Sequence, residues 1–239
     1  MPSIETMGIA LVIVAFASAL QASIGFGLAL VAAPLLALLD RAYVPGPLIA
    51  AGLGLCLAMA WRERGAIDTR GLPAAVSGRL LGVLPAGYVL SVASQSAFDL
   101  LFASLVLLGV GLSLLHTRIV PTPRAVFGAS ALSGLMGTIT SIGGPPLALV
   151  YQSQSGPVLR ATLAANFAVG CLLSLTTLAV IGLFGRSEVW LAATLLPGVV
   201  LGLLISRPLR GLLDRGATRP WVLGLSAISA LAVLTRALA

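Results

Sequence analysis

Long apolar runs, separated by short polar stretches that contain Arg, make up most of the chain. Eight runs can be read, near residues 7–39, 44–61, 72–92, 96–115, 125–151, 161–184, 189–206 and 220–238. Their apolar positions do not alternate with polar ones, which favours helices over the strands of a barrel. About 20 apolar residues cross the ~30 Å hydrocarbon core of a bilayer. The pattern therefore predicts an all-α integral membrane protein.

Two of the runs contain a break. Run 7–39 is too long for one simple span and is interrupted by Ser23-Ile24-Gly25-Phe26-Gly27. Run 125–151 is interrupted by Thr140-Ser141-Ile142-Gly143-Gly144-Pro145-Pro146. Proline lacks the backbone donor of a helix, and glycine weakens helices. Each of these runs is predicted to be a broken or re-entrant helix rather than one continuous span.

The two breaks resemble each other. Ser-Ile-Gly opens both, and Leu-Ala-Leu-Val follows at 28–31 and again at 147–150. Gly78 and Gly82 in the third run correspond to Gly198 and Gly202 in the seventh. We therefore expect one membrane domain built from two repeats, residues 1–118 and 119–239. Each repeat has a broken helix followed by three plain transmembrane helices: 44–61, 72–92 and 96–115 in the first, and 161–184, 189–206 and 220–238 in the second.

The distribution of Arg indicates how the repeats sit in the membrane. If both broken runs dip in and return to the same face, ten Arg lie in loops 62–71, 116–124, 153–160 and 207–219. The other face then carries Arg41, Arg186 and Arg236. Because positively charged loops stay in the cytoplasm, the Arg-rich face is predicted to be cytoplasmic, with both chain ends on the opposite face. Three crossings per repeat make the two repeats inverted.

Composition supports a membrane protein and excludes several other classes. Hydrophobic residues make up 59 % of the chain and charged residues 9 %, too little charge to cover a soluble surface. The net charge of +7 would suggest nucleic acid in a soluble protein. Here the Arg side chains lie in short loops, so we predict the lipid bilayer as partner and no nucleic acid. The first 23 residues are not predicted to be a signal peptide, since they carry Glu5 and no positive charge.

The sequence offers little for catalysis or metal binding. His116 is its single histidine, and Cys56 and Cys171 each lie alone within an apolar run. No nucleophile with a base, carboxylate pair or metal spacing converges within the membrane. We predict that the protein is not an enzyme and needs no cofactor or metal.

The breaks are the best candidates for a binding site. A new half-helix begins after each one, with free backbone N–H groups and partial positive charge at its start. Neither break contains an acid, so an anion is the expected ligand. Arg79 is the one charge well inside a plain span. The predicted substrate-binding residues are Gln21, Ser23, Gly25, Gly27, Arg79, Thr140, Ser141, Gly143, Gly144 and Asn166. The alternative is that the small residues only permit tight packing and that Arg79 extends to the membrane surface.

At these residues the chain resembles a known family. Ser23-Ile24-Gly25-Phe26-Gly27 leading to Pro34, and Ser141-Ile142-Gly143-Gly144-Pro145-Pro146, look like the two signature stretches of the TauE/SafE sulfite exporters. The turn Arg64-Gly65-Ala66-Ile67-Asp68 is similar to the loop of their first repeat. Many members have a glycine where this chain has Phe26. The resemblance implies a permease in the bacterial inner membrane that moves sulfite or organosulfur anions such as sulfoacetate, usually outward.

These observations predict a transporter that binds a small anion at the membrane midplane, between the tips of two broken helices. An anion channel and a structural or assembly subunit remain alternatives, and the chain could form a homo-oligomer. Inverted repeats with discontinuous helices are a recurring transporter architecture, which is why transport is the first hypothesis.

Overall fold

The computed structural model describes residues 2–115, 119–213 and 219–238. Within those ranges every regular element is helical, so the predicted all-α class is confirmed. His116 and Arg215, which the sequence analysis placed in Arg-rich loops, lie outside the described residues.

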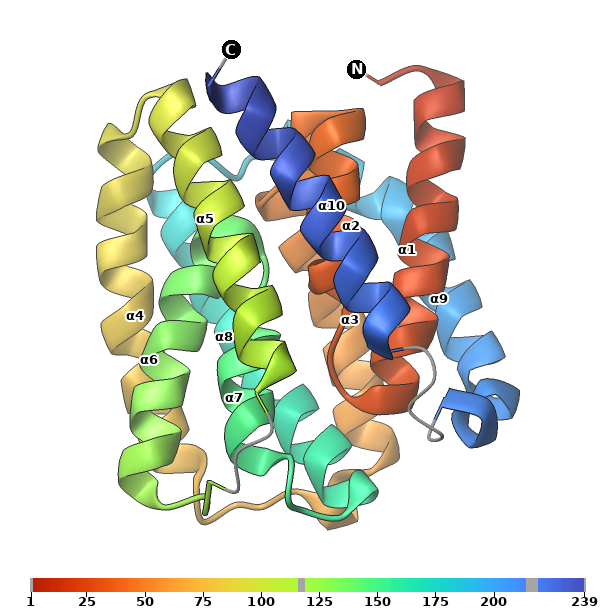
Figure 1. Cartoon of the computed structure of the whole chain (residues 1–239), viewed down its shortest axis with the longest axis vertical. Helices are drawn as coiled ribbons and strands as arrows, with labels where there is room; N and C mark the ends of the chain where they lie inside the picture. Colours follow the sequence, from red (N-terminus) through yellow and green to blue (C-terminus); the bar gives the residue numbers. More distant parts are fainter. Residues whose placement is uncertain (1, 116–118, 214–218, 239) are drawn as a thin grey trace.

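The first half of the chain folds into five α-helices and two short 3₁₀ helices. Its elements are α1 (Ile4–Ile24), α2 (Leu28–Leu39), η1 (Arg41–Tyr43), α3 (Gly46–Arg62), η2 (Arg64–Ala66), α4 (Leu72–Val92) and α5 (Gln95–Leu114). The second half contributes α6 (Pro123–Thr140), α7 (Gly144–Tyr151), α8 (Gly156–Val180), α9 (Arg186–Leu213) and α10 (Arg219–Leu238). Figure 1 shows both chain ends at one end of the bundle and the α3–α4 and α7–α8 connections at the other.

Five helical segments in the described residues are long and apolar enough to cross a membrane. They are Ile4–Ile24, Leu72–Val92, Gln95–Leu114, Gly156–Val180 and Arg186–Ser206. The first of these is α1, which the sequence analysis treated as half of a broken element. With 21 residues, α1 rises about 31 Å and could cross the hydrocarbon core alone. The chain interruption after α1 therefore lies near the end of a full-length helix.

Local sequence signals explain where several helices begin and end. The hydroxyls of Ser3, Ser94 and Thr122 accept hydrogen bonds from the backbone N–H three residues later, which caps α1, α5 and α6. At the other end of α1, Gly25 has a φ of 108°, a conformation that glycine adopts at little cost. Ser141 ends α6 in the same left-handed region, with a φ of 67°.

Small residues allow two helix pairs to pack closely. Gly78 and Gly82 on α4 face the backbone carbonyls of Phe127 and Ala131 on α6, where an added methyl group would collide. On α9, a methyl group on Gly198 would lie 2.7 Å from the Leu11 carbonyl oxygen of α1. Glycines spaced four residues apart thus let α4 approach α6 and α9 approach α1.

Candidate functional site

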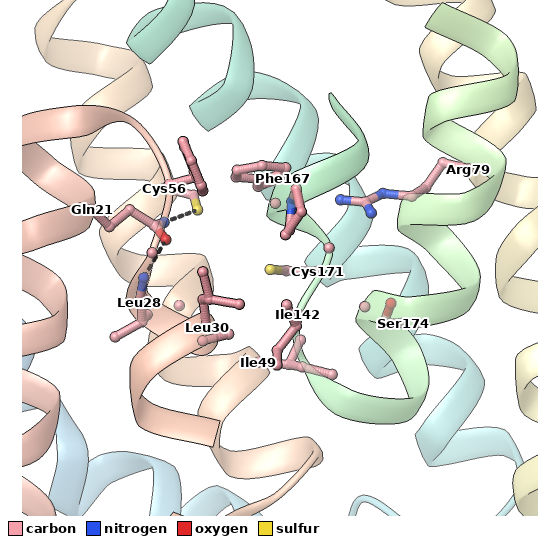
Figure 2. Close-up of a pocket in the computed structure, with 18 residues that line it drawn as sticks. Gln21, Leu28, Leu30, Ile49, Cys56, Arg79, Ile142, Phe167, Cys171 and Ser174 are labelled. Carbon is pink, nitrogen blue, oxygen red and sulfur yellow. Dashed lines mark hydrogen bonds between the residues drawn. The ribbon is translucent and has the colours of Figure 1, made fainter. Parts of the chain in front are cut away.

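The two chain interruptions meet at one internal cavity. Gly27 and the start of α2 line one side of it, and Ile142, Gly143, Gly144 and Pro145 line the other. Side chains from α1, α3, α4 and α8 complete the wall (Figure 2). The cavity has a volume of about 60 Å³. Segments that are far apart in the sequence therefore form a single small site.

Gln21 fixes the geometry of the first interruption. Its Oε1 atom accepts a hydrogen bond of 3.1 Å from the backbone N–H of Leu28, the first residue of α2. Its Nε2 atom lies 3.4 Å from the Sγ atom of Cys56 on α3 and donates to it. One side chain of α1 thus holds the start of α2 against the cavity (Figure 2).

The second interruption is held by two hydroxyl groups of α6. Thr140 Oγ1 accepts a hydrogen bond of 3.1 Å from the backbone N–H of Ile142. Ser133 Oγ donates a hydrogen bond to the carbonyl oxygen of Gly143. These contacts hold Gly143 and Gly144 at the cavity, where α7 begins.

Arg79 on α4 reaches the same point. Its Nη1 atom donates a hydrogen bond of 2.6 Å to Ser133 Oγ. Its guanidinium carbon lies 5.8 Å from the centre of the Phe167 ring on α8. Gly170, one helical turn further along α8, leaves room for the guanidinium, because a methyl group there would overlap it. The residue is 5 % exposed, so its side chain points into the bundle and does not extend to the surface (Figure 2).

Among the described residues, no carboxylate lies beside the charge of Arg79 in the cavity. None of the described lining residues is acidic. The ion pairs found among the described residues join Arg41 with Asp99, Arg62 with Glu63 and Arg160 with Glu63, and leave Arg79 out. A buried charge is costly unless an opposite charge or a set of hydrogen bonds stabilises it. The arrangement can therefore accept an anion in the cavity and would repel a cation.

A model of the family described as "Sulfite exporter TauE/SafE" matches residues 10–233, nearly the whole chain. This protein belongs to the TauE/SafE family. No curated protein and no solved structure matches the chain. Family membership makes it a membrane exporter of sulfite or a related anion, in agreement with its apolar helices. The family is one of transporters, which agrees with the prediction that the protein is not an enzyme.

The structure brings half of the predicted site residues to the cavity. The residues that line it are Gln21, Gly27, Arg79, Gly143 and Gly144. Three of the remaining predicted side chains form hydrogen bonds within the bundle instead. Ser23 Oγ donates to the Ala19 carbonyl, Thr140 Oγ1 to the Met136 carbonyl, and Asn166 Nδ2 to the Thr162 carbonyl.

Two further predicted residues lie at the edges of the interruptions. Ser141 Oγ donates a hydrogen bond of 3.1 Å to the Pro45 carbonyl oxygen, on the side of η1. Gly25 packs against the backbone of Arg160 at the start of α8, where an added methyl group would lie 3.2 Å from its Cα atom. Neither residue lines the cavity.

Several residues of the site were not anticipated from the sequence. Ser133 holds both Arg79 and Gly143, yet its position within an apolar helix resembles that of other small residues of α6. Its role depends on the rotation of α6 toward Arg79, which the sequence does not show. The further lining residues include Phe26, Cys56, Phe167, Cys171 and Ser174.

Charged side chains surround the end of the bundle below the first interruption. Arg160 Nε lies 3.1 Å from Oε2 and 3.2 Å from Oε1 of Glu63, and both side chains are largely buried. Arg62 donates a hydrogen bond of 3.1 Å to the Ala22 carbonyl near the end of α1. These contacts tie the α3–α4 connection to α8 and to the end of α1.

A second and larger cavity lies among the connections at the opposite end of the bundle. Its volume is about 270 Å³, and its walls include Arg41, Pro45, Gln95 and Glu188. Pro45, whose carbonyl binds Ser141, borders this cavity, while Ile49 on the next turn of α3 lines the smaller one.

Proposed function

We propose that the protein is a carrier that exports a small oxyanion, sulfite or a small sulfonate, and binds it in the cavity between the two interruptions. The observation that supports this most strongly is the buried positive charge of Arg79, which faces the cavity without a carboxylate. Gly143, Gly144 and Gly27 bring the backbone close to the same space, where amide groups at helix starts favour negative charge.

Electrostatic attraction to Arg79 would contribute substantially to binding. Two unit charges about 4 Å apart interact by roughly 4 kcal/mol at an effective dielectric constant near 20. Hydrogen bonds to the guanidinium add to this, because charge-assisted hydrogen bonds are stronger than neutral ones. Arg79 alone could therefore account for much of the affinity for an anion.

The size of the cavity favours the smallest candidate ligands. Its volume of about 60 Å³ is less than half of the roughly 150 Å³ of an engineered cavity that binds benzene. A sulfite ion has fewer heavy atoms than benzene, whereas sulfoacetate has more. In this conformation the cavity suits sulfite better than the larger organosulfonate.

We further propose that two inverted repeats, residues 1–118 and 119–239, move relative to each other to expose the cavity alternately to the two membrane faces. The equivalent contacts of α4 with α6 and of α9 with α1 support this division. The Glu63–Arg160 ion pair lies at the Arg-rich end, and the cavity beside Pro45 lies at the other end. The Arg-rich end would be cytoplasmic, as the Arg asymmetry predicts.

Flux into proteoliposomes tests this function. Purified protein should give saturable uptake of radiolabelled sulfite, which a carrier shows and a structural subunit does not. Arg79→Gln should lower the initial rate at least tenfold, whereas Arg124→Gln, at an exposed position of α6, should not. Equal rates for the wild type and Arg79→Gln would exclude this cavity as the transport site. A conductance that does not saturate would favour a channel.

A further inference from the structure

The two cysteines of the chain meet at the anion cavity. Cys56 on α3 and Cys171 on α8 both line it, and their helices pack against each other. Figure 2 shows both side chains at the cavity, with the Cys171 sulfur directed toward its centre. Two residues that are isolated in the sequence thus line the same small cavity.

Both cysteines are thiols, and a neighbouring side chain holds Cys56 at the cavity wall. Both cysteines are free, and Cys56 is 2 % exposed. The hydrogen bond from Gln21 Nε2 fixes the Cys56 sulfur at the cavity wall. A cavity that admits a small oxyanion also admits an oxidant of similar size, so burial from bulk solvent does not protect the pair.

We propose that Cys56 and Cys171 form a redox-reactive pair, whose oxidation to a disulfide by a small peroxide blocks the anion cavity. This inference rests on the proposed function of the cavity. One thiol attacks the peroxide O–O bond, giving a sulfenic acid and one molecule of water. The second thiol attacks that sulfur, the S–S bond forms, and the hydroxyl leaves as a second water. Two thiols lose two electrons and two protons, and hydrogen peroxide takes them up.

The disulfide would block transport in two ways. It would join α3 of the first half to α8 of the second half, which restricts the relative movement that alternating access needs. It would also fix the two sulfur atoms within a cavity of about 60 Å³. Sulfite itself would not restore the site, because its attack on one sulfur leaves an S-sulfonate in the cavity and releases the other as a thiolate. Dithiothreitol would restore both thiols.

Hydrogen peroxide, followed by catalase and desalting, provides the test on purified protein. Peptide mapping under denaturing, thiol-blocked conditions should find Cys56 linked to Cys171. Sulfite flux in proteoliposomes should fall at least tenfold and return after dithiothreitol. Sulfite flux should fall less than twofold after peroxide in each single-cysteine variant, relative to the flux of the same variant before peroxide. These variants are Cys56→Ser, Cys171→Ser, Cys56→Ala and Cys171→Ala.

The outcomes separate this inference from the proposed function. Mapping detects the disulfide whether or not the protein transports sulfite, so absence of flux before oxidation contradicts only the proposed function. If peroxide oxidises the thiols to other products and no disulfide forms, the proposed pairing of Cys56 with Cys171 is wrong. If the disulfide forms and sulfite flux is unchanged, the proposed block of transport is wrong. Equal loss of flux in wild type and single-cysteine variants also contradicts it.

Discussion

Arg79 Nη1 donates a hydrogen bond of 2.6 Å to Ser133 Oγ, and Ser133 in turn donates to the carbonyl of Gly143 at the second chain interruption. The one buried arginine of α4 is therefore positioned by α6 and linked to the backbone that faces the cavity. A ligand bound to the guanidinium in this position would lie beside the backbone of Gly143. Binding and the shape of the interruption are expected to be coupled through this serine.

Ser133→Ala tests this coupling. The substitution leaves the guanidinium and the Gly143 carbonyl without a partner, and hydrogen bonds to charged groups contribute about 1.5–3 kcal/mol. Sulfite affinity should fall roughly ten- to 150-fold, as measured by calorimetry on purified protein under anaerobic conditions. Ser130→Ala is the matched control, because this buried hydroxyl of α6 has no hydrogen-bond partner among the described residues. A similar loss in both variants would contradict the role of Ser133.

Gly170→Ala should displace the guanidinium without disrupting the helix. The added methyl group would overlap the end of the Arg79 side chain, which can move, and not a backbone atom. We expect sulfite affinity to fall at least tenfold while the melting temperature stays within a few degrees. Gly128→Ala on α6 is the control, since no atom of the part of the chain that the structure describes lies within 4 Å of its added methyl group. Normal affinity in Gly170→Ala would show that the position of Arg79 is unimportant.

Glu63→Gln should destabilise the Arg-rich end of the bundle. It leaves Arg160, only 12 % exposed, without its opposite charge. Because the pair is partly screened by solvent, we expect a loss of about 1–2 kcal/mol. The melting temperature in detergent should drop measurably, whereas Glu5→Gln, at an exposed position of α1, should leave it unchanged. Equal melting temperatures would show that the ion pair contributes nothing to stability.

The orientation in the membrane is open to direct measurement. Figure 1 places both chain ends at the end of the bundle opposite the α3–α4 connection, and the ten-to-three distribution of Arg in the sequence predicts that this connection is cytoplasmic. Reporter fusions should therefore place both termini outside the cytoplasm and the 62–71 loop inside. A cytoplasmic C-terminus would contradict this predicted orientation.

The sequence predicted the helical class and the positions of the two interruptions because apolar length and Gly-Pro clusters act locally. It also identified Arg79 as a candidate, since a charge within an apolar span is rare. Which polar side chains face the cavity could not be predicted, because that depends on the rotation of each helix. Ser23 and Thr140 illustrate this, since their hydroxyls bind carbonyls one turn earlier in the same helix. Cys56 and Cys171 meet only through the packing of α3 on α8.

The central claim is that Arg79 provides the charge that binds the anion, and calorimetric titration of sulfite into the wild type, Arg79→Gln and Arg79→Lys measures this directly. We predict a loss of affinity of at least a hundredfold for Arg79→Gln. A smaller loss is expected for Arg79→Lys, which keeps the charge without the planar fork of donors. Arg124→Gln is the control for net charge. Unchanged affinity in folded, monodisperse Arg79→Gln would contradict the account.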